Sequence, residues 1–316
     1  MNSDSSFFVS EDLTLETNKS EKYIGRFAPS PTGPLHFGSL IAATASYLNA
    51  KIHADNKWLL RIEDVDTQRI QKGAADSIIN TLEAYGFEWH GDVIYQSQRS
   101  DIYAEALASI KTSIYPCSCT RKSLMASSEK YYYLYPGFCR NGVTNKDNVN
   151  HSIRVVTNEE SLCFTDGCQA KPFCQNINKE VGDFNLKRSD GLWAYQFAVV
   201  VDDALQGVTE VVRGADLFDN TPRQIYLQRL LAYPQPHYFH FPVAVNTDGK
   251  KLSKQNQSAQ VSSDNKRATL IEALRFLGQI TPEANEFASL DDLWLWAVQN
   301  WKPSNVPKVL TLLYKV

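Results

Sequence analysis

The sequence predicts an α/β protein whose doubly wound parallel sheet is split by an insertion and followed by a small helical domain. Three observations lead to this class. Short apolar runs alternate with helical patterns after the first twenty residues, which is typical of a parallel sheet covered on both faces. A polar stretch rich in cysteine and tyrosine interrupts this alternation, which then resumes. The last segment contains only short amphipathic patterns.

The first half of the sheet is expected before the interruption. A short strand leads into the turn PSPTGPLHFGS, whose prolines and glycines end it, and a helix and a short buried strand follow. Two further helices complete this half, and Ser100 is a suitable N-cap for the second. The predicted elements are strand 22–28, helix 39–50, strand 57–62, helix 72–85 and helix 101–111.

The second half of the sheet is expected after the interruption. Valine-rich runs at 194–201 and 208–212 predict buried strands. A helix is predicted over 221–233, where Pro222 takes a favourable first-turn position. Three short amphipathic helices are predicted beyond it, over 267–277, 290–301 and 306–315.

These elements divide the chain into five parts. The predicted parts are a disordered N-terminal extension over 1–20, the first half of the sheet domain over 21–114, the insertion over 115–190, the second half over 191–257 and a small helical domain over 258–316.

The composition excludes several classes of protein. The chain has 316 residues, 43% hydrophobic and 21% charged, so it can bury a large core without disulfides. No apolar run reaches the ~18 residues of a membrane-spanning helix. The first twenty residues lack the basic opening of a targeting peptide, so we expect a cytoplasmic protein with no membrane partner. Because the formal net charge is −3, a nucleic-acid partner must be held by a local patch.

The turn before the first helix is suited to an anion. Backbone N–H groups and the positive end of the helix dipole meet there, and phosphate is the anion most often bound at such a site. His36 can donate to a phosphate oxygen, and Gly38 lets a nucleotide approach the backbone closely. His36 can also cap the helix, and the alternative to a phosphate site is that His36 merely satisfies a turn and the prolines stiffen a loop.

A second motif that could bind phosphate is KLSK at 251–254. Lys251 and Lys254 flank Ser253 and can close over a triphosphate, neutralising the charge that develops during transfer. Taken alone, the same residues are more typical of a solvated loop.

Charged side chains follow three of the predicted strands. Arg26, Glu63 and Arg213 lie at or just after strand ends, and ligands of an open parallel sheet sit beyond these ends. Glutamate carries two carboxylates and one ammonium group, so two arginines and one carboxylate give each charge a partner. A neutral or basic amino acid would leave buried charges unpaired. The residues therefore predict an acidic amino acid as the substrate.

The two candidate phosphate-binding motifs, PSPTGPLHFGS and KLSK, together resemble the signature motifs of class I aminoacyl-tRNA synthetases. The segments GRFAPSPTGPLHFGSL, RIEDVDTQR, VVDDALQGVTEVVRGADL, TPRQ and KLSKQN occur in matching order over roughly 23–257. They are similar to the glutamyl-tRNA synthetase family, and most of all to its truncated branch, which attaches glutamate to the queuosine base in the anticodon loop of tRNA(Asp). The resemblance implies a Rossmann-like catalytic domain.

The resemblance also implies roles for individual residues. It assigns catalysis to His36 and Lys254, and it assigns ATP contacts to those two residues together with Gly38, Lys251 and Ser253. It implies a glutamate pocket lined by Arg26, Phe27, Ala28, Pro29, Ser30, Glu63, Tyr195 and Arg213. Three alternatives stay open: Tyr195 as a core residue, Arg213 as a cap of the turn after it, and Glu63 as an acid in an exposed turn.

The implied reaction uses ATP with Mg²⁺ as substrate and forms glutamyl-adenylate without tRNA. No nucleophilic serine or cysteine is needed. Only 62 residues follow Lys254, too few for a large anticodon-reading domain, so we expect queuosine-bearing tRNA(Asp) as the acceptor and a monomeric enzyme. The alternatives are a glutamyl-tRNA synthetase that charges the 3′ end and a non-catalytic amino-acid or tRNA-binding paralogue. A nucleotidyltransferase is disfavoured because HFGS replaces its usual H-x-G-H.

Cysteines in the insertion predict one structural zinc ion per chain. Cys117, Cys119 and Cys139 can supply three ligands of a tetrahedral site in a reducing compartment. The resemblance points to Tyr135 as the fourth ligand, and His151 or the neighbouring tyrosines 131–133 are alternatives. Unmetallated buried thiols are a further alternative.

Two other features of the insertion are less specific. The spacing of Cys163, Cys168 and Cys174 does not match a metal knuckle, so we interpret them as structural residues that are not part of a disulfide framework. The tyrosines at 131–135 have basic neighbours and predict either contact with an RNA loop or a packed aromatic patch.

Overall fold

The structure is a computed structural model that describes residues 22–128, 130, 134–145, 150–169, 171–249, 251, 261 and 264–314. The predicted N-terminal extension, the tyrosines at 131–133, Ser253 and Lys254 lie outside these residues. Within the described ranges, no helix is both long and apolar enough to cross a lipid bilayer.

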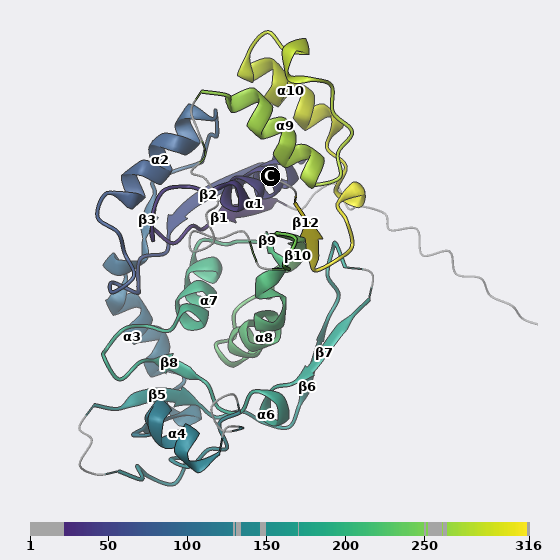
Figure 1. Ribbon diagram of the computed structural model, residues 1–316. Coiled ribbons are helices and arrows are strands. Elements are labelled where there is room, and N and C mark those ends of the chain that lie inside the picture. The colour runs from purple at the N-terminus through teal and green to yellow at the C-terminus, as the bar shows by residue number, and fades with distance from the viewer. Residues whose placement is uncertain are drawn as a thin grey trace, which may run out of the picture.

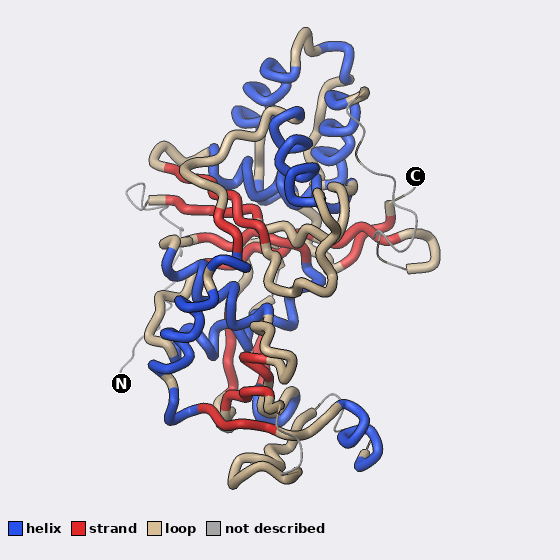
Figure 2. Tube along the Cα trace, turned by 90° about the vertical axis from the view of Figure 1, so that its left-hand side faces the viewer, coloured by secondary structure: helices blue, strands red, loops and turns tan. Residues whose placement is uncertain are grey.

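A parallel sheet forms the centre of the molecule. Strands β1 (Tyr23–Phe27), β2 (Asn56–Ile62) and β3 (Ile94–Tyr95) pair in parallel in that order. Strands β9 (Glu210–Gly214) and β10 (His237–Phe241) form a second parallel pair. The backbone N–H of Thr209 donates to Ile24 O at 2.9 Å, so β9 begins alongside β1. Figure 2 shows these strands as a band between helices, which confirms the α/β class with a parallel sheet.

Two apolar cores hold the helices against this sheet. Helices α1 (Phe37–Lys51), α2 (Ala74–Ala84), α9 (Lys266–Phe276) and α10 (Leu290–Asn300) share one core with β1 and β2. Helices α3 (Ser100–Ser109), α7 (Tyr195–Leu205) and α8 (Thr221–Leu230) share the other. The small alanine and serine side chains of α1 let it be buried almost all round, because neighbouring elements can approach it closely.

The segment predicted as a strand over 194–201 is wrong, because α7 occupies it. A continuous apolar run does not distinguish a buried strand from a buried helix, and α7 is buried from Phe197 through Asp203. The N-cap predicted for α3 is also wrong. Arg99 takes that position, and Ser100 Oγ instead accepts a hydrogen bond from Trp193 Nε1 at 3.0 Å.

The last predicted helix, over 306–315, is wrong as well. Strand β12 (Thr311–Leu313) lies there and pairs in parallel with β11 (Val243–Val245). The partner strand lies far away in the sequence, so local amphipathicity could not reveal it.

The region between α3 and α7 contains antiparallel sheet, which the sequence did not predict (Figure 1). Strands β4 (Ile114–Cys117), β5 (Ser152–Val155) and β8 (Asn185–Lys187) form one sheet. Strands β6 (Ser161–Phe164) and β7 (Phe173–Asn176) form a hairpin. Short helices α4 (Arg121–Ser127) and α6 (Ile177–Glu180) flank them.

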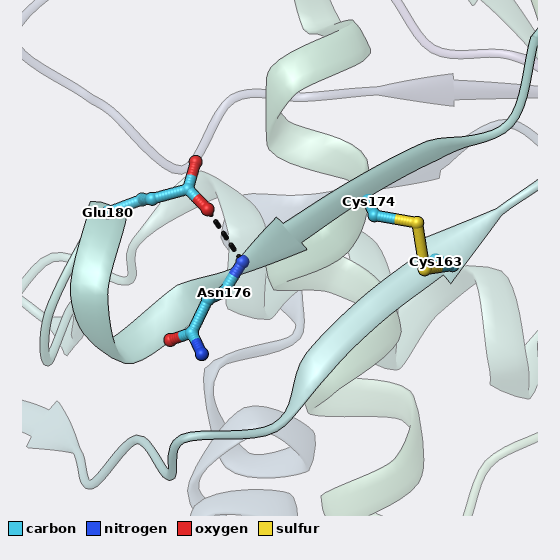
Figure 3. Close-up of a disulfide and its surroundings, with 4 residues drawn as sticks. All are labelled: Cys163, Cys174, Asn176 and Glu180. Atoms are coloured by element: carbon cyan, nitrogen blue, oxygen red, sulfur yellow. Dashed lines mark hydrogen bonds between the residues drawn. A yellow bond between two sulfur atoms is a disulfide. The ribbon is translucent and has the colours of Figure 1, made fainter.

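The β6–β7 hairpin carries a disulfide, so the expectation that Cys163 and Cys174 take no part in disulfide bonding is wrong. Cys163 and Cys174 lie directly opposite each other in the ladder and are bonded (Figure 3). Cross-strand neighbours have Cβ atoms close enough for such a bond, whereas their separation in sequence gives no sign of it. The hairpin then enters α6, where Glu180 accepts a hydrogen bond from the Asn176 backbone at 2.7 Å. Cys168 remains a free, buried thiol.

Candidate active site and metal centre

A cavity of about 820 Å³ lies beyond the carboxyl ends of β1, β2 and β9, next to the N-terminus of α1. This is where ligands of open parallel sheets sit. Arg26 and Arg213, which are far apart in the sequence, both line it. The other predicted site residues in its wall are Phe27, Ala28, Pro29, Ser30, His36, Gly38, Glu63, Tyr195 and Lys251.

Arg26 is held by a buried carboxylate. Its Nε and Nη2 atoms donate to the two oxygens of Asp203 at 3.1 and 3.3 Å. Asp203 also accepts from Arg61 Nη1 at 2.8 Å, so one carboxylate serves two guanidinium groups. Burial alone would raise the pKa of Asp203, but Arg26 and Arg61 outweigh it and lower that pKa.

Glu63 belongs to the same network, but its charged form is stabilised less than that of Asp203. Its carboxylate accepts from Arg61 Nη2 at 3.2 Å, and it is 7% exposed, so the alternative of an exposed acidic turn is wrong. Burial raises the pKa of Glu63, and the nearby charges of Arg61 and Arg26 only partly offset this effect. Arg61 has a raised pKa although burial opposes it, because Asp203, Glu63 and Asp202 all favour its charged form.

Sequence reasoning missed Arg61 and Asp203. One available signal was the pair Asp202 and Asp203 inside an apolar run, since buried acids need partners. With these two residues included, the guanidinium groups of Arg26 and Arg61 face the carboxylates of Asp203 and Glu63. Arg213 lies outside this group of four and adds a further positive charge. Arg26 and Glu63 therefore belong to a larger charged network than the predicted three residues, and Arg61 connects them through Asp203.

Arg213 has a different environment, since its hydrogen-bond acceptors among the described residues are all neutral. Its Nε donates to His240 Nε2 at 2.9 Å, its Nη1 to Gln224 Oε1 at 2.7 Å and its Nη2 to Thr221 Oγ1 at 2.8 Å. The carbonyl of Leu217 accepts a longer bond of 3.4 Å. The alternative expectation was that Arg213 caps the turn over 214–216. Its hydrogen bonds instead go to residues that follow this turn.

Tyr195 opens helix α7 rather than lying in a strand. It packs partly against the core that contains α7 and also lines the cavity, so the two interpretations of this residue are compatible. Burial raises its pKa to about 12, with Glu63 acting in the same direction, so the phenol keeps its proton, and its oxygen can still accept a hydrogen bond.

His36 is the N-cap of α1, one of the two roles that its position allowed, and it also lines the cavity. Its Nδ1 accepts from the Ser39 backbone at 3.2 Å, which leaves the proton of a neutral ring on Nε2, next to Ser39 Oγ at 3.2 Å. Lys251 pairs with Asp216 at 2.5 Å, and both residues line the cavity.

The three predicted cysteine ligands come together at the end of β4, where Cys119 follows Cys117 and a turn brings in Cys139. The sulfur atoms of Cys117, Cys119 and Cys139 all lie within 4.8 Å of one another. The phenol oxygen of Tyr135 is 3.2 Å from Cys117 Sγ and 3.5 Å from Cys119 Sγ. Among the described cysteine, histidine and acidic residues, this metal-ligand group contains the three cysteines and not His151.

These distances suit a tetrahedral zinc ion. Zinc–sulfur bonds of about 2.3 Å place two sulfur ligands about 3.8 Å apart, and Cys119 Sγ lies 3.7 Å from Cys139 Sγ. The guanidinium of Arg154 lies 3.8 Å from the centre of the Tyr135 ring, and its Nε donates to Cys117 Sγ at 3.3 Å. Burial and the neighbouring thiols raise the pKa of the Tyr135 phenol, so a phenolate ligand would require a bound metal ion to displace its proton.

The fold and the cavity together define a class I tRNA synthetase catalytic domain. The family model for the catalytic domain of class I tRNA synthetases (E and Q) matches residues 24–304, so the chain belongs to this family and is a ligase-type enzyme. The solved glutamate-tRNA synthetase of Elizabethkingia anophelis superposes with a TM-score of 0.75 at 24% identity, over 93% of this chain and 68% of that one. This likeness concerns the fold alone.

Curated relatives specify the branch. A protein of Dechloromonas aromatica named glutamyl-Q tRNA(Asp) synthetase is 49% identical over 298 residues, which are 92% of this chain and 98% of the relative. A protein of Thiobacillus denitrificans with the same name is 50% identical over 288 residues, 90% of this chain and 95% of the relative. The predicted resemblance to the truncated branch is therefore confirmed.

Proposed function

We propose that the chain activates glutamate with ATP to glutamyl-adenylate, without tRNA, and transfers the glutamyl group to the queuosine base of tRNA(Asp). The observation that carries the first half is the cavity, which combines Arg26, Arg213 and Glu63 with the N-terminus of α1. The names of relatives about half identical over nearly the whole chain support the acceptor.

The proposed first step needs no covalent enzyme intermediate. The α-carboxylate of glutamate attacks the α-phosphorus of MgATP, a new O–P bond forms, and pyrophosphate leaves with the electrons of the broken P–O bond. The two arginines hold the carboxylates of glutamate, and Glu63 with Tyr195 faces its ammonium group. His36, Gly38, Lys251, Ser253 and Lys254 contact ATP in this proposal, with His36 and Lys254 stabilising the transferred phosphoryl group.

The second step is attack of a queuosine hydroxyl on the mixed anhydride, which releases AMP. The experiment supplies labelled glutamate, ATP and tRNA(Asp) isolated with or without queuosine, and then maps the label by nuclease digestion. Label in the anticodon fragment of queuosine-bearing tRNA alone is the expected result. Label at the 3′ end of either tRNA would instead establish a glutamyl-tRNA synthetase.

We propose that Cys117, Cys119, Cys139 and Tyr135 hold one structural zinc ion. The core around them contains few apolar residues, so a metal would contribute much of the local stability. Purified protein should contain one equivalent of zinc, and Cys139→Ser should lose it. Cys168→Ser is the matched control, because that buried thiol contacts only the carbonyls of Val306 and Pro307 among its described hydrogen bonds. A full equivalent of zinc in Cys139→Ser would refute the assignment.

The division of the chain belongs to the same proposal. Strands β1 to β3 precede residues 115–190 and β9 with β10 follow them, which supports an insertion between two halves of one catalytic domain. We also propose a small C-terminal unit over 258–316, in which α9 and α10 pack on the core that contains α1 and β1, and β12 pairs with β11.

A further inference from the structure

Two buried residues behind the cavity connect Arg213 to a distant hairpin. His240 is on β10 with 0% of its surface exposed, and Asp166 follows β6 with 4% exposed. His240 Nδ1 lies 2.5 Å from Asp166 Oδ2, and His240 Nε2 lies 2.9 Å from Arg213 Nε. Carboxylate, imidazole and guanidinium thus form a continuous chain that ends at the cavity wall.

The hydrogen-bond chemistry of this chain fixes the state of the ring. An arginine Nε always carries a proton and can only donate, so His240 Nε2 must accept. The ring proton then lies on Nδ1 and is donated to Asp166. Burial lowers the pKa of His240 to about 4, with Arg213 acting in the same direction and Asp166 against it, so the ring is neutral at pH 7.

The side chain of Asp166 is held in place by backbone hydrogen bonds. Its Oδ1 accepts from the backbone N–H groups of Cys168, Gln169 and His240 at 2.9, 3.0 and 3.2 Å. Oδ2 is left for the imidazole, and the hairpin disulfide lies between β6 and β7, the strands that flank this loop. The carboxylate therefore sets both the orientation and the tautomer of His240.

We propose that Asp166 and His240 are positioning residues for the substrate: Asp166 fixes the His240 ring, and His240 fixes the Arg213 guanidinium through a neutral acceptor. A carboxylate at the place of His240 would orient Arg213 equally well but would neutralise it. The imidazole separates these two effects, so the charge of Arg213 stays available to a carboxylate of the amino-acid substrate. The inference deepens the proposed function and rests on it.

Two substitutions of one residue test the proposal. Glutamine at 240 can place an amide oxygen near the site of Nε2, whereas asparagine is too short and reaches only toward Asp166. Because a hydrogen bond to a charged group is lost, His240→Asn should raise the KM for glutamate about 10- to 100-fold. His240→Gln should stay within about fivefold of wild type, and kcat and the KM for ATP should change less than about threefold in both.

Glutamate-dependent ATP–pyrophosphate exchange of the full chain provides these constants. His237→Gln is the control, since His237 is exposed at the start of the same strand. Equal losses in His240→Asn and His240→Gln, or parallel changes in both KM values, would overturn the positioning role. If the asparagine variant does not fold, Asp166→Asn replaces it and should give an intermediate rise in the KM for glutamate.

A spectroscopic measurement is independent of catalysis. Long-range ¹H–¹⁵N spectra of the wild-type chain should show a neutral ring at position 240 with its proton on Nδ1. A ring protonated on Nε2 would refute the inference whatever the activity. Wild-type protein that shows this tautomer but no glutamate-dependent exchange would instead contradict the proposed function, so the two failures are distinguishable.

Discussion

The two cavity arginines are held in opposite ways. Arg26 is bonded to both oxygens of Asp203, with Arg61 sharing the same carboxylate, so its charge is largely compensated within the protein. Arg213 is bonded to neutral acceptors, including His240, Gln224 and Thr221. The difference separates two tasks. Arg26 shares its charge between Asp203 and a substrate carboxylate and so also supports the fold, whereas Arg213 keeps its whole charge for the ligand.

The largest expected effect is the loss of the Arg213 charge. Arg213→Gln should lower kcat/KM for glutamate about 100- to 1000-fold, because a charged interaction with the substrate is lost. Its thermal stability should change little, since no buried carboxylate loses its only partner. Exchange kinetics and a melting curve measure both quantities. A large drop in melting temperature with nearly normal kinetics would reverse the comparison.

Arg26→Gln is the matched variant in the other environment. Asp203 then loses its hydrogen bonds from Arg26 but keeps Arg61 as a charged partner, so the free energy of unfolding should fall by about 1.5 to 3 kcal/mol. The loss of glutamate activation should be smaller than in Arg213→Gln. Urea unfolding with both variants side by side gives the comparison, and equal stability of the two would contradict it.

The pH dependence of stability should distinguish Asp203 from Glu63. The pKa of Asp203 is lowered in the folded chain, so its contribution is complete above the ordinary value of about 4 and is lost as pH falls through the folded value. Asp203→Asn should therefore be less stable than wild type at pH 7, with the gap closing in acid. Unfolding measured from pH 7 to about pH 3 tests this.

Glu63 should behave in the opposite direction. Its pKa is raised, so the folded chain favours the protonated form, and the stability linked to that proton is lost as pH rises through the folded value. Glu63→Gln should thus be at least as stable as wild type at pH 7 while using glutamate poorly. A destabilised Glu63→Gln would show that the carboxylate supports the fold and would weaken its assignment to the substrate ammonium group.

The smallest effect is expected at the neutral contacts of Arg213. Thr221→Val removes the hydroxyl that lies 2.8 Å from Nη2 but keeps a similar side-chain shape. One hydrogen bond to a charged group is lost while the others remain, so the KM for glutamate should rise about 3- to 10-fold. An unchanged KM would show that His240 and Gln224 alone are sufficient to hold Arg213.

Local patterns anticipated the main parts of the cavity. Arg26, Glu63 and Arg213 were expected at strand ends because short apolar runs mark strands, and the carboxyl ends of parallel strands meet at one edge. The turn before α1 followed from its prolines and glycines. The same patterns failed at α7 and β12, where burial on all sides or a distant pairing partner decided the element.

The sequence by itself determined which groups with strong charge or hydrogen-bonding capacity follow each strand, since that depends on neighbours along the chain. Only the tertiary structure decided which acceptor each arginine receives. Asp203 is separated from Arg26 by 177 residues, and Asp166 from His240 by 74. Hydrogen bonds and ion pairs act over a few ångströms in space, and residues so far apart in the chain meet only after the packing of α7, β10 and the β6–β7 hairpin brings them together.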